Sequence, residues 1–202
     1  MSVQRSTVRR RESYHHGDLK RALTSAALSL VAEQGPKGFT LTEAARRAGV
    51  SAAAPYRHFA DKAELLAAVA EQGFHELHTD LAAAADRVSD PRERVMELGR
   101  VYVRWAVAHP DHYQVMFGAE SLKAEQPGVA VAGLEAFGDL LDAITRCQEA
   151  GIAGGQDPRE IAGPLWSLVH GVASLAIGGH LQAVGIDQAP DDLVTGVVAQ
   201  VL

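Results

Sequence analysis

Apolar residues recur along the chain at the spacing expected for amphipathic α-helices. Between Asp18 and Glu33 they fall on one helical face, at Leu19, Leu23, Ala26, Ala27 and Leu30. No stretch shows a convincing two-residue alternation of a strand. The sequence therefore predicts an all-α fold, with further helices from Lys62 to about Arg87, from Pro91 to His109, from Val129 to Ala150, from Asp157 to Gly179 and from Asp191 to Leu202.

Residues 38–66 predict two short helices joined by a tight turn. Thr40 and Glu43 have the spacing of a capping box, which starts a helix at about Leu41. Gly49 is expected to end it, because glycine tolerates the left-handed conformation found after helix C-termini. Ser51 is then placed to cap the second helix by accepting backbone N–H bonds.

A third helix is predicted to follow at once. Asp61 and Glu64 repeat the cap-plus-three spacing just before an apolar run. Two helices joined by a glycine-containing turn form the layout of a helix-turn-helix motif, whose second helix enters a DNA major groove.

These stretches resemble the N-terminal domain of the TetR family of bacterial transcriptional repressors. The matching pieces are HGDLKRALTSAALSLVAEQGPKGF, FTLTEAARRAGVS, APYRHF and DKAELL, which together span residues 16–66. The sequence departs from the commonest family pattern at Pro55, where Leu or Ile is more usual. The resemblance implies contacts to DNA bases or backbone from Thr40, Thr42, Ser51, Ala52, Ala53, Ala54, Tyr56, Arg57, His58 and Lys62.

The chemistry of these side chains suits DNA. Arg57 carries a bidentate donor fork that fits guanine or a phosphate. Tyr56 and His58 can donate to phosphates, which fixes position rather than sequence. The alanine methyls at 52–54 can pack on thymine methyls. Phe59 is instead expected to pack in the core of the head.

Charge is distributed unevenly along the chain. The net charge of the whole chain is -6, yet residues 1–62 carry a net +6 and the remaining residues a net -12. A basic head on an acidic body concentrates phosphate attraction at one end. Residues 1–15, which include Arg9, Arg10 and Arg11, predict a mobile arm. The arm either contacts the DNA minor groove or phosphates, or remains a solvated tail.

The segment from Ile161 to Gly179 is apolar on nearly every face, which predicts burial on nearly every face. Its length raises the question of a membrane span, but Pro164, His170, Ser174 and its glycines argue against one. Packing on the chain's own body on one side and on a second subunit on the other explains the pattern better. The homodimer is therefore expected to form through Ile161–Gly179 and Asp191–Leu202, and its interface to include Leu168, Val172, Leu175, Val194 and Val197.

Aromatic residues of the body suggest a site for a small, largely apolar effector. Trp166, His170 and Gly171 resemble a Trp…His-Gly signature that a subset of the TetR family carries in its C-terminal domain. Trp166 and His170 share a helical face. The predicted pocket comprises Tyr102, Trp105, Tyr113, Met116, Phe117, Phe137, Trp166 and His170. The alternative is that these residues belong to the core and the subunit interface.

Other functional classes find less support. His75 and His78 suggest metal ligands, but zinc-site helices more often space two histidines four apart, which favours a solvated face. An enzyme would need a nucleophile elbow, a metal-ligand cluster or a phosphate loop. A helical protein-interaction module with a vestigial head fits poorly with the basic head. The single cysteine, Cys147, fits a reducing cytoplasm.

The sequence thus predicts a basic arm (1–15), a helix-turn-helix head of three helices (16–62) and a larger helical effector-binding and dimerisation body (63–202). The expected function is ligand-responsive transcriptional regulation, most simply repression. In that reading a homodimer binds a pseudo-palindromic DNA operator and is released by a small apolar effector. No catalytic residue, cofactor, metal or membrane contact is expected.

Overall fold

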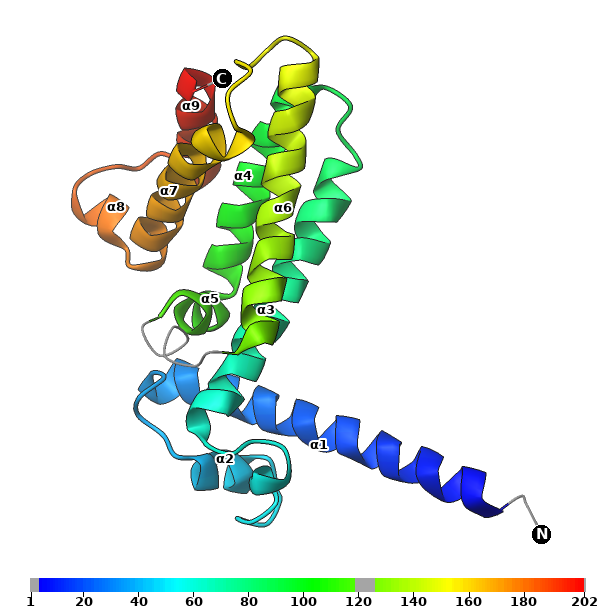
Figure 1. Cartoon of the computed structure of the whole chain (residues 1–202). Helices are drawn as coiled ribbons and strands as arrows, with labels where there is room; N and C mark the ends of the chain where they lie inside the picture. The colour runs from blue at the N-terminus through cyan, green and yellow to red at the C-terminus, as the bar shows by residue number, and fades with distance from the viewer. Residues whose placement is uncertain (1–3, 119–125, 202) are drawn as a thin grey trace. The chain divides into compact units, whose positions relative to one another are not determined.

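The computed structural model describes the backbone of residues 4–118 and 126–201, and the side chains of these ranges from residue 19 onwards. Within the described residues the regular structure is helical throughout, which confirms the predicted all-α fold (Figure 1). The chain divides into two compact units. Unit 1 comprises Met1–Ala70 and Asp111–Gln126, and unit 2 comprises Glu71–Pro110 and Pro127–Leu202.

Unit 1 contains the helix-turn-helix stretch. Its core includes Leu23, Phe39, Phe59 and Leu65, all almost fully buried, so Phe59 packs as predicted. The exposed Arg47 guanidinium pairs with the Glu33 carboxylate and joins α2 to α1. The helical elements of this unit are α1 (Gln4–Gln34), α2 (Leu41–Arg47), the 3-10 helix η1 (Pro55–Arg57), the first residues of α3 (Lys62–Ala85) and α5 (Pro110–Phe117).

Helix α1 begins earlier than predicted. It includes residues 4–15, for which the sequence predicts a mobile arm; residues 1–3 of that arm lie outside the described part of the chain. Arginine, glutamine and glutamate have high helix propensities, and the stretch contains no proline. Gly17, the only strongly unfavourable residue before Asp18, costs about 1 kcal/mol relative to alanine, which a continuous helix tolerates.

Unit 2 is built around α4, against which α6, α7 and α9 pack. Asp90 caps α4, and Asp157 caps α7 by accepting a hydrogen bond from the Arg159 N–H at 2.9 Å. In both helices the capping aspartate is followed by a proline in the first turn, where a missing N–H costs little. Besides the rest of α3, the unit contains α4 (Pro91–Ala108), α6 (Pro127–Glu149), α7 (Pro158–Ile177), the unpredicted one-turn α8 (His180–Ala183) and α9 (Pro190–Val201).

Gly99 lets α4 approach its neighbours closely. A Cβ atom placed on Gly99 would lie 2.7 Å from Val194 Cγ1 of α9 and 3.5 Å from Val169 Cγ2 of α7. Val194 is 0% exposed. The assignment of Val194 to a subunit interface is therefore wrong, because its side chain is fully buried in the core of its own chain.

Helix α7 carries two apolar stripes. Ile161, Leu165 and Val169 are buried in unit 2, whereas Leu168 and Leu175 are 44% and 45% exposed. By length and composition alone α7 could cross a membrane, and it is the one helix of the described residues that meets this test. Buried helices of water-soluble folds meet the same test, so the result is weak support for a span.

Candidate nucleic-acid interface and ligand site

The N-terminus of α2 is fixed by a complete capping box. The Thr40 hydroxyl accepts from the Glu43 N–H at 3.2 Å, and the Thr40 N–H donates to Glu43 Oε2 at 2.8 Å. The Thr40 hydroxyl also donates to Glu43 Oε2 at 2.9 Å. These bonds from Thr40 hold the pKa of the Glu43 carboxyl below its usual range. The predicted start of the motif is confirmed.

The turn after α2 depends on a left-handed glycine. Gly49 has φ of 71°, a conformation that a residue with a Cβ adopts only with strain. Val50 N–H then donates to the Ala45 carbonyl at 3.0 Å, which closes the C-terminal end of α2. Gly49 therefore ends the first helix of the motif as predicted.

The second helix of the motif is shorter than predicted. Only Pro55–Arg57 form a helix, of the 3-10 type, and Ala54 precedes it without a side-chain cap. The prediction that Ser51 caps an α-helix is therefore wrong. The physical reason is Pro55: it has no N–H to donate to the Ser51 carbonyl, which instead accepts from the Ala54 N–H at 2.9 Å.

Most of the residues predicted to contact DNA are exposed on unit 1. Tyr56 is 60% exposed, a high value for a large aromatic side chain. The Arg57 guanidinium makes no hydrogen bond or ion pair with any described residue, so its donor fork is available. Ala54 and His58 are half-buried, and the remaining exposed members are Thr40, Thr42, Ser51, Ala52 and Ala53.

Lys62 has a role that sequence reasoning missed. Its Nζ donates to the Phe39 carbonyl at 3.0 Å and to the Lys37 carbonyl at 3.2 Å. The same ammonium lies 5.2 Å from the centre of the Phe39 ring, a cation–π distance. Lys62 thereby ties the first turn of α3 to the loop before α2. The pattern K-G-F followed by a lysine at a helix start contains no signal that would have predicted this bond.

The predicted effector residues divide between the two units. The Tyr113 and Phe117 rings lie 4.9 Å apart between centres, tilted by 54°, in unit 1, which also contains Met116. Unit 2 contains Tyr102, Trp105, Phe137, Trp166 and His170.

Four of the unit 2 residues form a continuous aromatic cluster. The Trp166 ring lies 6.2 Å from Phe137 and 5.4 Å from His170, and the Tyr102 hydroxyl is 2.9 Å from His170 Nδ1. Burial lowers the pKa of His170, so its imidazole is neutral at pH 7. Trp166 is 39% exposed, so one edge of the cluster faces outward. An aromatic surface with a neutral polar group suits an uncharged, largely apolar ligand.

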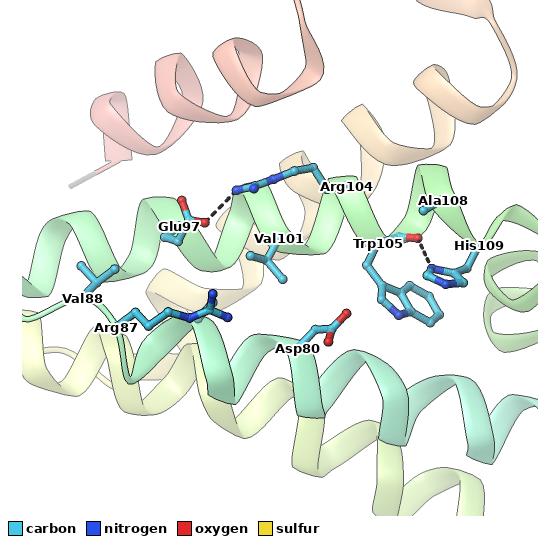
Figure 2. Close-up of a pocket in the computed structure, with 10 residues that line it drawn as sticks. Asp80, Arg87, Val88, Glu97, Val101, Arg104, Trp105, Ala108 and His109 are labelled. Carbon is cyan, nitrogen blue, oxygen red and sulfur yellow. Dashed lines mark hydrogen bonds and ion pairs between the residues drawn. The ribbon is translucent and has the colours of Figure 1, made fainter.

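A groove in unit 2 involves a different set of residues. It has a volume of about 470 Å³ and lies between α3 and α4 (Figure 2). Of the predicted effector residues it includes Trp105 alone. Its remaining lining combines charged and small apolar groups: Asp80, Ala84, Arg87, Val88, Glu97, Val101, Arg104, Ala108 and His109.

The histidines of α3 pair with acidic side chains of α6. His78 Nδ1 lies 2.8 Å from Asp139 Oδ2, and His75 Nδ1 lies 3.6 Å from Glu135 Oε2. The half-buried His78 thus differs from the solvated face expected for both. Burial raises the pKa of Asp139, and the bond from His78 opposes that effect. Among the described residues no three His, Cys, Asp or Glu side chains gather as a metal site would require.

Both halves of the chain match models of known protein families. Residues 23–69 match the family of bacterial regulatory proteins called tetR, and residues 95–201 match the tetracyclin repressor-like C-terminal domain. The HTH-type transcriptional regulator BetI of Rhizobium meliloti (strain 1021) is 40% identical over 85 residues, 42% of each chain. The chain thus matches about two fifths of the length of these curated relatives.

Solved structures resemble nearly the whole chain. A protein of unknown function from Rhodococcus sp. RHA1 is 35% identical, with a TM-score of 0.81 over 93% of this chain and 95% of that one. The fatty acid degradation regulator FadR from Bacillus halodurans has a TM-score of 0.72 over 91% and 94% of the two chains; at 16% identity it shows a shared fold. The chain therefore belongs to the TetR family of bacterial regulatory proteins, whose members are DNA-binding transcription regulators and not enzymes.

Proposed function

We propose that this chain is a ligand-responsive repressor that binds a pseudo-palindromic DNA operator as a homodimer. The observation that carries the proposal is the exposed surface of unit 1, where Tyr56 and Arg57 follow the Gly49 turn and the Arg57 guanidinium has no partner among the described residues. A net charge of +6 over residues 1–62 supports the attraction of this surface to phosphates. The proposed contacts to DNA come from the exposed residues Thr40, Thr42, Ser51, Ala52, Ala53, Tyr56 and Arg57. Arg57 is the main candidate for reading a base.

The homodimer would form through the outer face of α7 together with α9. Leu168, Val172 and Leu175 lie on one side of α7 at i, i+4 and i+7. Two of them are nearly half exposed and Val172 is half-buried, a pattern typical of a helix that packs against a partner. Val197 of α9 is half-buried and joins this set in the proposal.

The effector would bind at the aromatic cluster of Phe137, Trp166, His170 and Tyr102. Two of these residues, Trp166 and His170, belong to the stretch that resembles the Trp…His-Gly signature, in which Gly171 follows His170. A neutral His170 favours a small, largely apolar molecule over an ion. The protein would act in the cytoplasm, where operator DNA lies.

Two heads must meet major grooves about 34 Å apart on the operator. An effector can release DNA only as far as its affinity differs between the DNA-bound and released arrangements. A coupling of about 1–3 kcal/mol would weaken DNA binding roughly 5–150-fold.

The experiment is selection of an operator from random duplex DNA, followed by measurement of affinity at several salt concentrations. A palindromic consensus and a steep fall of affinity with salt are expected. Arg57→Ala should lower affinity for the selected operator, whereas Arg159→Ala, an exposed arginine of α7, should leave it unchanged. Failure to enrich any sequence, or equal affinity for all duplexes, would refute operator recognition.

The effector part of the proposal is tested separately. Small apolar compounds would be screened by thermal shift, and each compound that binds would be added to the operator complex. Release of the operator within the range above supports the proposal. A bound compound that leaves the affinity for the operator unchanged refutes its role as effector.

A further inference from the structure

The α3–α4 groove of unit 2 differs in chemistry from the aromatic cluster proposed for the effector. Figure 2 shows Asp80 of α3 and Arg87, in the turn after it, projecting into the space between α3 and α4, with Val101 and Trp105 on the α4 side. Its volume of about 470 Å³ lies in the range of small-molecule sites. The groove therefore has room for a ligand of its own.

Two charged residues of the groove, Glu97 and Arg104, already form ion pairs within the chain. Glu97 accepts from Arg104 at 2.7 Å and from Arg100 at 3.3 Å. The Arg104 Nε also lies 3.3 Å from Asp191 Oδ2 of α9. These contacts neutralise Glu97 and Arg104 within unit 2, so neither needs a ligand to balance it.

Two other charged residues of the groove, Asp80 and Arg87, form no ion pair with any described residue. Arg87 Nε donates to the Ala83 carbonyl at 2.7 Å, which anchors the side chain and leaves its two terminal nitrogens with no partner among the described residues. The Asp80 carboxylate has no hydrogen bond or ion pair with any described residue. The two opposite charges face one groove without meeting within ion-pair distance.

The surface of the groove between these charges is apolar. Val101 and the Trp105 ring contribute from α4, and Ala84 from α3. The Trp105 ring stacks on His109 at 4.8 Å, and His109 Nδ1 donates to the Trp105 carbonyl at 2.9 Å, so the aromatic wall is held in place. The Arg87 terminal nitrogens and the Asp80 carboxylate, which have no partner among the described residues, thus lie beside a preformed apolar surface.

We propose that the α3–α4 groove binds a small zwitterion with an ammonium group, a carboxylate and an apolar skeleton between them. The carboxylate would accept hydrogen bonds from the Arg87 fork, and the ammonium would donate to Asp80. The skeleton would lie on Val101 and Trp105. This site is separate from the aromatic effector cluster and does not depend on operator binding.

The test uses the full chain and a series of ω-amino acids: 4-aminobutanoate, 6-aminohexanoate and 8-aminooctanoate. Binding is measured by titration calorimetry and by the fluorescence of Trp105 in a Trp166→Phe background, where it is the remaining tryptophan. One chain length is expected to bind best, because the two fixed charges set a span. Hexanoate and hexylamine, each with one charged end, should bind at least about tenfold more weakly than the matched amino acid.

Matched variants locate the two ends. Asp80→Asn and Arg87→Gln should each weaken the best amino acid by about tenfold, whereas Asp86→Asn, a neighbouring carboxylate outside the groove, should not. Asp80→Lys replaces the anion of the groove with a second cation. It should therefore shift the preference from an amino acid to a dicarboxylate such as adipate. Absence of binding across the series, equal binding of hexanoate, or unchanged affinity in Asp80→Asn and Arg87→Gln would each overturn the proposal.

Discussion

The Tyr102 hydroxyl and His170 Nδ1 lie 2.9 Å apart and join α4 to α7 inside unit 2. The two residues are far apart in the sequence, and each lies on a helix that packs against the other. Burial lowers the pKa of His170 from its ordinary value of 6.5. The bond therefore links a neutral imidazole to a phenol in a half-buried position, and its pH dependence can be derived.

Stability should fall on mild acidification because of His170. Its pKa is lower in the folded chain than in the unfolded chain, so below about pH 6.5 the unfolded state binds the extra proton first. Urea unfolding at pH 7.5, 6.5 and 5.5 should show a free energy of unfolding that decreases as the pH falls. In His170→Gln the decrease should be smaller. Equal slopes for the two chains would show that His170 does not carry the effect.

Arg57→Ala should weaken operator binding by about 1–3 kcal/mol if the side chain reads a base. Preference should then relax at one position in each half-site. A uniform loss across sequences, together with a salt slope reduced by about one, would instead identify a phosphate contact. Affinities for single-base operator variants at several salt concentrations distinguish the two cases.

Leu168→Glu and Val172→Glu should each give monomers or aggregates, because a dimer would bury the new carboxylate without a partner. Leu134→Glu is the matched control: Leu134 is 71% exposed but lies on α6. Light scattering on all three variants measures the outcome. An intact dimer in both α7 variants would remove α7 from the interface.

Gly99→Ala should destabilise unit 2 by about 1–3 kcal/mol, because the new methyl would lie 2.7 Å from the buried Val194. Gly138→Ala on α6 meets no atom within 4 Å and should instead stabilise its helix by up to about 1 kcal/mol. Thermal unfolding of the two variants gives the comparison. Equal effects would mean that α4 and α9 have room between them.

Lys62→Gln separates two roles for one lysine. Loss of its bonds to the Phe39 and Lys37 carbonyls should lower the stability of unit 1. If those bonds are its role, the salt slope of operator binding should stay unchanged. A slope reduced by about one, with unaltered stability, would show that Lys62 contacts a phosphate as the family resemblance implies.

Local rules account for the parts of the fold that the sequence predicted. The pairs Thr40–Glu43 and Asp61–Glu64 each satisfy helix N-terminal donors within four residues, so their spacing alone is informative. Gly49 is similarly local, since its role depends on one backbone angle. The helix boundaries therefore lie close to those predicted for most of the chain.

The remainder depends on contacts between distant residues. The burial of Val194 follows from its packing against Gly99, and the anchoring of Lys62 follows from the path of the loop through Phe39. Apolar character alone placed Tyr113 with Tyr102, although the two lie in different compact units. The sequence could not predict that Asp80 and Arg87 lack ion-pair partners among the described residues, because only three-dimensional contacts show which charges are paired.

The proline in the segment proposed to contact DNA has a consequence for how operator preference could change. Pro55 withholds one donor from the Ser51 carbonyl, and the segment is wound more tightly than an α-helix for that reason. In an α-helix each residue advances the side-chain direction by about 100°, and in a 3-10 helix by about 120°. The directions of the Tyr56 and Arg57 side chains therefore depend on the backbone conformation that Pro55 imposes. A single substitution at position 55 can reorient both side chains while leaving residues 56 and 57 themselves unchanged.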